Sequence, residues 1–112
     1  MSLKIWYGRG MKLEHESVEN LRRDIARIVG KHLDTDKYRV FFFGSRVKGD
    51  SMPRSDIDIG IEGPEEIPRR VKAEIEEELE ELPILYEMDV VDFTAASEKF
   101  RHFARRWTEP II

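Results

Sequence analysis

The chain has 112 residues, of which 40% are hydrophobic and 38% are charged, and its formal net charge is −4 at pH 7. This length suits a single domain over residues 1–112 with its core over about 14–107, and the negative net charge argues against general nucleic-acid binding through a basic surface. The chain has no cysteine, which excludes disulfides, and neither a secretory signal nor a run of about 18 apolar residues, so we expect no membrane span and a cytoplasmic location.

The first part of the chain contains an undecided segment and a predicted helix. Residues 1–12 are either a flexible arm or an edge strand, and the sequence leaves both alternatives open. From about residue 14 to residue 33, apolar residues recur at helical spacing with charged residues between them; they are Val18, Leu21, Ile25, Ile28, Val29 and Leu33. The spacing predicts an amphipathic helix that packs one stripe onto a sheet, with Gly30 near its end.

Two predicted strands flank a turn that contains glycine. Residues 38–43 are aromatic and β-branched, which is typical of a central strand buried on both faces, and this run stops at Gly44 and Ser45. Residues 46–50 can form a short helical turn. Isoleucine alternates with other residues in 55–62, which predicts a strand with two distinct faces. One face carries Ile57, Ile59 and Ile61, and the other carries Asp56, Asp58 and Gly60.

A second helix, a third strand and a last helix complete the predicted order. Residues 67–82 have an apolar stripe opposite a run of glutamates, which we interpret as a solvated helix face, and residues 86–93 form a strand. The last helix begins at Thr94 or Ser97. Its apolar stripe comprises Phe100, Phe103, Ala104 and Trp107. Trp107 and residues 110–112 are apolar enough to dock on a surface, either of this chain or of a partner. The order predicts an α/β (α+β) domain with helices packed against a small mixed sheet.

The turn after the first strand has the features of a phosphate site. Backbone N–H groups at such a turn bind anions, and Gly44 lets a phosphate approach because glycine has no Cβ. We predict that the Ser45 hydroxyl binds a terminal phosphate, together with the backbone N–H groups of Ser45 and Arg46. Further positive charge is expected from Arg46, Lys48 and Arg54. A strand that ends in Gly-Ser is common, so this motif alone is a weak indication.

Three aspartates on two predicted strands form a candidate metal site. Asp56 and Asp58 are two residues apart and therefore point to the same face of a strand. Asp89 lies in the third strand between apolar residues, and Asp92 is the second choice because it faces the other way. Nucleotidyl transfer uses two Mg²⁺ ions about 3.5–4 Å apart, held by carboxylates. We therefore predict that Asp56, Asp58 and Asp89 are the metal ligands and catalytic residues.

Several of these features also have simpler interpretations. An Asp-x-Asp pair on a strand is more often a solvated face than a site, and only its combination with the turn and a third acid is specific. The histidines have no metal-ligand spacing, and we interpret them as surface or capping residues; they are His15, His32 and His102. The basic face of the last helix is either plain exposed surface or a contact for a partner or an RNA backbone.

The two motifs resemble those of a known family. The turn reads Gly44-Ser45-Arg46-Val47-Lys48-Gly49, and the acidic strand reads Ser55-Asp56-Ile57-Asp58-Ile59. Together they resemble the Gly-Ser-x-x-x-Gly and Ser-Asp-x-Asp signature of the nucleotidyltransferase superfamily related to DNA polymerase beta. The short chain and the acid in Met88-Asp89-Val90 look like its minimal nucleotidyltransferase (MNT) branch, and the resemblance covers roughly residues 38–93.

The resemblance implies an activity and a partner. It implies two Mg²⁺ ions on Asp56, Asp58 and Asp89, phosphates on Gly44 and Ser45, and transfer of AMP from ATP onto a hydroxyl acceptor. Minimal members commonly pair with a HEPN-domain protein that resembles an RNase toxin, so the resemblance implies an antitoxin of a type VII-like pair that adds AMP to a toxin tyrosine. Two alternatives stay open, namely a non-catalytic antitoxin that acts by contact and a small-molecule nucleotidyltransferase.

Overall fold

A computed structural model of the protein describes residue 13, residues 17–49 and residues 55–112. Within these residues, helices and strands follow one another in the order α1 (Val18–Gly30), β1 (Arg39–Phe43), α2 (Ser45–Lys48), β2 (Ile57–Glu62), α3 (Arg69–Glu80), β3 (Met88–Asp92), α4 (Glu98–Ala104) and β4 (Thr108–Pro110). The predicted order of helix, strand, strand, helix, strand and helix is confirmed, the predicted helical turn is α2, and β4 is a further strand that the sequence did not predict. The expectations for residues 1–12 and for Arg54 lie outside the described residues.

The helix ends follow local chemistry. Ser17 caps α1, because its Oγ accepts a hydrogen bond of 3.2 Å from the backbone N–H of Asn20. Ser97 caps α4 in the same way through Phe100 N–H, at 3.1 Å, which selects Ser97 over Thr94 as the start of this helix. None of the described helices has the length and apolar character needed to cross a bilayer.

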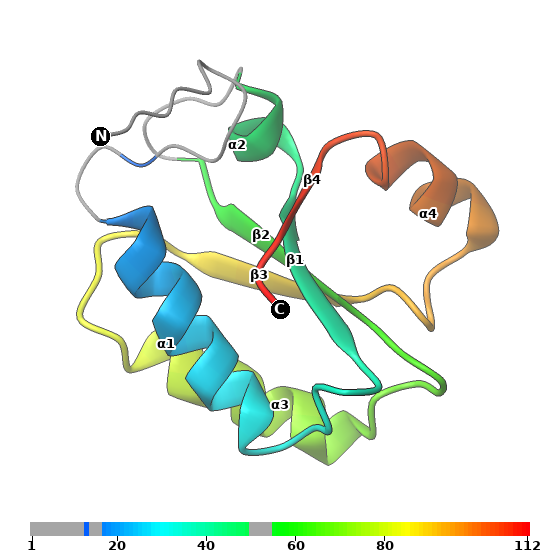
Figure 1. Cartoon of the computed structure of the whole chain (residues 1–112), viewed down its shortest axis with the longest axis horizontal. Coiled ribbons are helices and arrows are strands. Elements are labelled where there is room, and N and C mark those ends of the chain that lie inside the picture. Colours follow the sequence, from blue (N-terminus) through cyan, green and yellow to red (C-terminus); the bar gives the residue numbers. More distant parts are fainter. Residues whose placement is uncertain (1–12, 14–16, 50–54) are drawn as a thin grey trace.

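The four strands form one mixed sheet in the order β3-β2-β1-β4. β1 pairs antiparallel with β2 and with β4, whereas β2 pairs parallel with β3 through the crossover helix α3. In Figure 1, α1 and α3 lie side by side against one face of this sheet, and α4 lies apart from them. The α/β architecture with a small mixed sheet is therefore as predicted.

The main core lies between the sheet and the pair α1 and α3. The predicted alternation in β2 is confirmed, because its three isoleucines are fully buried on this face together with side chains of both helices: Leu21, Ile25, Val29, Ile57, Ile59, Ile61 and Ile75. Each such side chain contributes about 1.5–3 kcal/mol relative to an exposed one. The other face holds a smaller cluster of Phe41, Phe43, Phe93 and Ala104 under α4.

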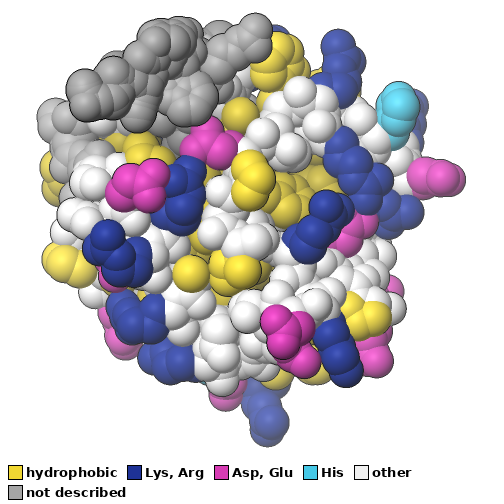
Figure 2. Space-filling model, in the orientation of Figure 1, with side chains coloured by type: hydrophobic (Ala, Val, Ile, Leu, Met, Phe, Trp, Pro, Cys, Tyr) yellow, Lys and Arg dark blue, Asp and Glu magenta, His cyan; other side chains and the backbone are white. Residues whose placement is uncertain are grey.

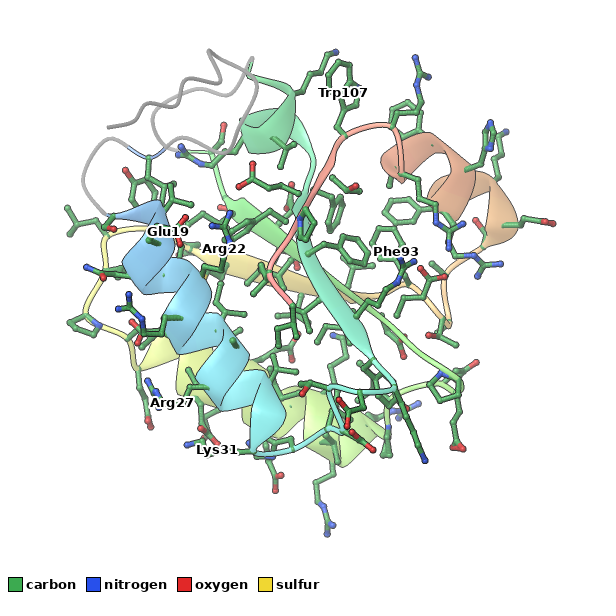
Figure 3. All side chains as sticks on the ribbon, in the orientation of Figure 1. Glu19, Arg22, Arg27, Lys31, Phe93 and Trp107 are labelled. Carbon is green, nitrogen blue, oxygen red and sulfur yellow. The ribbon has the colours of Figure 1, made fainter. Side chains whose placement is uncertain are left out.

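The C-terminal part of the chain confirms one expectation and modifies another. Residues 108–110 form β4 against β1, with Pro110 opposite Phe41, so the expected docking of the C-terminal residues is confirmed and their surface is the sheet of this chain itself. Arg22 of α1 holds the strand by donating to the Pro110 carbonyl at 3.2 Å and by an ion pair with Glu109, and it also binds Glu19 (Figure 3). The predicted apolar stripe of α4 is buried only at Ala104. Helical spacing predicted which residues share a side of the helix, but it did not predict that two of them, Phe100 and Phe103, stay exposed.

Candidate active site

Two of the predicted acids lie opposite each other in neighbouring strands. Asp58 of β2 is in register with Asp89 of β3 and with Phe43 of β1. Residues in register share a face of the sheet, so the three lie on the face away from α1 and α3. Asp56 is exposed and lies directly before β2, two residues from Asp58. The fold therefore places Asp58 and Asp89 on one face of the sheet, and Asp56 is near enough to Asp58 to influence its charge.

The pKa of Asp58 is raised by its burial and by the carboxylates near it. Burial, followed by the negative charges of Asp89 and Asp56, raises the pKa of the Asp58 carboxyl from 3.8 to about 6. Loss of water disfavours the charged form, and neighbouring carboxylates disfavour it further. A carboxyl group in this situation gains from a bound cation, because a cation removes both penalties at once.

The predicted phosphate turn lies against Asp58. Gly44 has φ 90° and ψ −158°, in the left-handed half of backbone space that favours glycine. A Cβ at this position would overlap the Asp58 carboxylate. The first backbone N–H groups of α2, at Ser45 and Arg46, begin directly after this glycine, and the first N–H groups of a helix have no partner within it. The turn and the acid therefore form one continuous surface, and only glycine fits between them.

The Arg46 side chain does not occupy the place that the sequence predicts. Its residue is 2% exposed, its Nε donates to the Ser55 carbonyl at 2.9 Å, and its guanidinium lies 4.7 Å from the ring centre of Tyr86. The Arg46 guanidinium therefore connects the turn to the two segments that lead into β2 and β3. Asp56 lies in the first of these segments, and Asp89 lies in β3 itself. Only the backbone N–H of Arg46 lies at the turn. Sequence reasoning missed this role, since no sequence pattern links Arg46 to Tyr86.

Asp92, the second choice for the third acid, lies on the wrong face. It is in register with Ile61, on the side of α1 and α3. Its Oδ2 accepts from Ile67 N–H at 2.8 Å and its Oδ1 from Thr94 N–H at 3.0 Å. Both oxygens therefore hold the loop backbone, and Asp89 is the carboxylate that faces Asp58.

Two other predicted groups have structural neighbours. The Lys48 ammonium lies 5.8 Å from the ring centre of Trp107, at the outer end of α2. His32 was predicted to be a surface or capping residue, but it is largely buried between α1 and α3, where its Nε2 lies 2.7 Å from Glu78. This histidine connects two helices on the side of the sheet away from the acids.

The donor set fits magnesium in its chemistry. Carboxylate oxygens together with substrate phosphate oxygens are the ligands that Mg²⁺ prefers, and Asp56, Asp58, Asp89 and the Ser45 hydroxyl supply oxygen donors only. In their present side-chain conformations, no three acidic or histidine side chains of the described residues converge on one point. Asp56 and Asp89 are exposed, so their side chains can rotate toward Asp58 without repacking the core.

A comparison with known protein families matches the part of the chain that contains this site. A family model described as polymerase beta, nucleotidyltransferase matches residues 23–112, which include the turn and all three acids. The chain belongs to this family. As a nucleotidyltransferase of the polymerase beta type, it has its family signature at one end of the sheet.

One curated protein with a named activity is similar to this chain. The probable protein adenylyltransferase MntA of Haemophilus influenzae is 33% identical over 69 residues, which are 62% of this chain and 60% of the relative. The matched region thus spans about three fifths of the relative's length.

Solved structures share the fold. A chain from the complex of a tri-AMPylated Shewanella oneidensis HEPN toxin with an MNT antitoxin is 18% identical, with a TM-score of 0.63 over 85% of this chain and 72% of that chain. A toxin–antitoxin complex with AMP-PNP is 20% identical with a TM-score of 0.66 over 86% of this chain and 73% of that chain. At these identities the likeness establishes the shared architecture.

Proposed function

We propose that this nucleotidyltransferase moves AMP from ATP onto a hydroxyl group of a partner protein in a Mg²⁺-dependent reaction. The partner we propose is a HEPN-domain toxin, and the acceptor is a tyrosine of that toxin. The observation that carries the proposal is the pairing of Asp58 with Asp89 directly beside the Gly44 turn. Phosphate-binding N–H groups and two carboxylates on one face are the arrangement that nucleotidyl transfer requires.

In this proposal, the turn and the acids have separate tasks. Ser45 and the backbone N–H groups that follow Gly44 hold the β- and γ-phosphates, which places the α-phosphorus over the acids. Asp56 and Asp58 would hold the magnesium ions, which neutralise charge that develops on the phosphates. At pH values above about 6, Asp58 is ionised and available as a ligand.

The bond changes involve the acceptor hydroxyl and ATP. The hydroxyl oxygen attacks the α-phosphorus, the bond from that phosphorus to the bridging oxygen of pyrophosphate breaks, and pyrophosphate leaves with its electron pair. Asp89 is exposed on the same face as Asp58 and is positioned to accept the proton of the attacking hydroxyl. The products are a phosphodiester-linked AMP on the acceptor and pyrophosphate.

The comparisons support the choice of substrate and acceptor. The curated relative is named a protein adenylyltransferase. One solved relative is bound to a HEPN toxin that carries AMP groups, and another is a toxin–antitoxin complex with AMP-PNP.

The decisive experiment combines the chain with labelled ATP, Mg²⁺ and a candidate HEPN-domain toxin from the same genome. We expect label on the toxin, and we expect Asp56→Asn/Asp58→Asn to remove it by about a hundredfold or more, since loss of even outer-shell metal contacts costs about 10–100-fold. Glu77→Gln, an exposed acid of α3, is the matched control. If the double variant still suppresses toxicity and the native chain transfers no label, the chain acts by contact and the proposal is wrong.

A further inference from the structure

Three aromatic side chains on and after α4 are exposed. Phe103 is 65% exposed, Trp107 39% and Phe100 37%. We call these three residues the α4 patch. Single exposed apolar residues are normal on a protein surface, but three exposed aromatic rings within eight positions of the chain are an unusual concentration of apolar surface. Phe100 anchors it, because its ring lies 5.5 Å from Phe93 and 6.2 Å from Phe43.

A groove runs beside the α4 patch. It has a volume of about 210 Å³ and is lined by residues of β1 and β4 and by Arg105, which directly follows α4. Its apolar lining includes Phe41 and Pro110, and its polar lining includes Arg39, Glu62 and Arg105. In Figure 2, a hydrophobic hollow between α4 and β4 is bordered by Lys and Arg side chains. Arg39 and Arg105 both pair with Glu62, so the groove itself suits apolar side chains of a partner, and any recognition of negative charge falls to cations outside it.

The charge around the α4 patch is opposite to that of the chain. The net charge of the chain is −4, yet residues 98–107 contain four Lys or Arg and one Glu. Arg101 donates to backbone carbonyls, and Arg105 pairs with Glu62. Among the described residues, Lys99 and Arg106 form no ion pair. Two exposed cations therefore flank the rings without a carboxylate of their own.

The α4 patch is continuous with the candidate active site. The Trp107 carbonyl accepts a hydrogen bond from Gly44 N–H at 3.3 Å, so the end of the patch adjoins the phosphate turn. Phe43, in ring contact with Phe100, is in register with Asp58. Figure 3 shows Trp107 near α2 and Phe93 between β1 and α4. A protein that covers the patch would therefore border the acids.

We propose that the α4 patch and its groove dock the acceptor protein, through a segment with apolar side chains flanked by Asp or Glu. This inference rests on the proposed function, because it assigns the surface by which that acceptor is presented. Aromatic residues together with Arg are the residues that most often dominate protein–protein binding energy. Lys99 and Arg106 supply the charge complementarity that speeds encounter and fixes orientation.

A nucleic acid fits this surface less well. Single strands stack on aromatic rings but need a positive path for their phosphates. A strand that crosses from Phe103 past Trp107 approaches the turn at Gly44, which lies against the Asp58 carboxylate, and negative charges close together repel each other. A polyanion would be repelled there, whereas a protein segment can place its few carboxylates on the cations alone.

The test measures binding and transfer separately. Isothermal titration calorimetry with the HEPN-domain protein of the transfer experiment compares the native chain with Phe103→Ser and with Lys99→Glu/Arg106→Glu. Matched controls are Leu85→Ser, which removes an 82% exposed apolar side chain, and Arg69→Glu/Arg70→Glu on α3. We expect each patch variant to bind at least about tenfold more weakly and the controls to bind like the native chain. Affinity for ATP with Mg²⁺ should be unchanged in all variants.

Each outcome has a defined meaning. Weaker binding confined to the patch variants supports the inference even if no AMP is transferred, in which case only the proposed function fails. Native affinity and label transfer in Phe103→Ser overturn the inference and leave the proposed function intact. Failure of the native chain to bind overturns the inference too. Loss of self-association, or loss of binding to a 20-nucleotide single-stranded RNA, in the patch variants would assign the patch to another occupant and also overturn it.

Discussion

Replacing Asp58 with Asn should stabilise the metal-free protein at neutral pH. The native fold raises the pKa of Asp58 from 3.8 to about 6, chiefly by burial and then through Asp89 and Asp56. Each pKa unit corresponds to about 1.4 kcal/mol, which gives at most about 3 kcal/mol. Because Asp58 is partly exposed, solvent screening reduces this, and we expect a gain of about 1–2 kcal/mol in the free energy of unfolding. For a domain of this size, that is about 4–8 °C in Tm.

The pH dependence gives the prediction its sign. Between about pH 4 and pH 6, the folded state of the native chain keeps the Asp58 proton while the unfolded state has lost it. The folded state therefore binds more protons, and stability falls as pH rises through this window. The full penalty is present above about pH 6 and absent below about pH 4. The advantage of Asp58→Asn should follow the same curve, small at about pH 4 and largest at about pH 7.5.

Urea unfolding at both pH values, with a chelator present, measures the difference. The control Glu77→Gln removes an exposed acid of α3, and we expect it to change stability by no more than about 0.5 kcal/mol. A lower midpoint for Asp58→Asn than for the native chain at about pH 7.5 would refute the reasoning. So would a gain of equal size at both pH values, since it would not come from ionisation.

Two further predictions concern the turn and the choice of third acid. Gly44→Ala should lower the free energy of unfolding by about 1–2 kcal/mol, because Gly44 has a positive φ and the added Cβ would overlap the Asp58 carboxylate. The control Gly30→Ala should be neutral or slightly stabilising, because its Cβ would meet nothing closer than 4.0 Å. Urea titration of both variants measures the difference. Asp89→Asn should abolish AMP transfer without loss of stability. Asp92→Asn should lower the free energy of unfolding by about 1–3 kcal/mol, because it weakens two hydrogen bonds to the backbone. It should leave the affinity for ATP unchanged.

Opposite results would point to specific errors. If Gly30→Ala and Gly44→Ala lose the same stability, neither the positive φ of Gly44 nor its closeness to Asp58 makes glycine necessary at the turn. If Asp92→Asn abolishes transfer in a stably folded protein while Asp89→Asn retains it, the third acid of the site has been assigned to the wrong residue. Label transfer to the toxin and urea titration, measured side by side, separate these cases.

Local patterns in the sequence predicted much of the molecule. The alternation of isoleucine with Asp56, Asp58 and Gly60 was enough to predict a strand with one buried face, because strand side chains alternate strictly. The helical spacing in residues 18–30 was equally sufficient for α1. The turn motif and the acid spacing were enough for the family, which the comparison confirmed. All of these signals lie within short stretches of chain, where neighbouring residues decide the outcome.

What the tertiary structure decided depends on contacts between distant segments. The register that sets Asp58 opposite Asp89, the burial of Arg46 against Tyr86 and the pairing of β4 with β1 join residues that are far apart in the sequence. A three-residue strand that ends in proline has no periodic pattern of its own, and a buried arginine looks like any surface cation in the sequence. Such features arise only when packing brings their partners together, because their energies belong to the contacts and not to the residues alone.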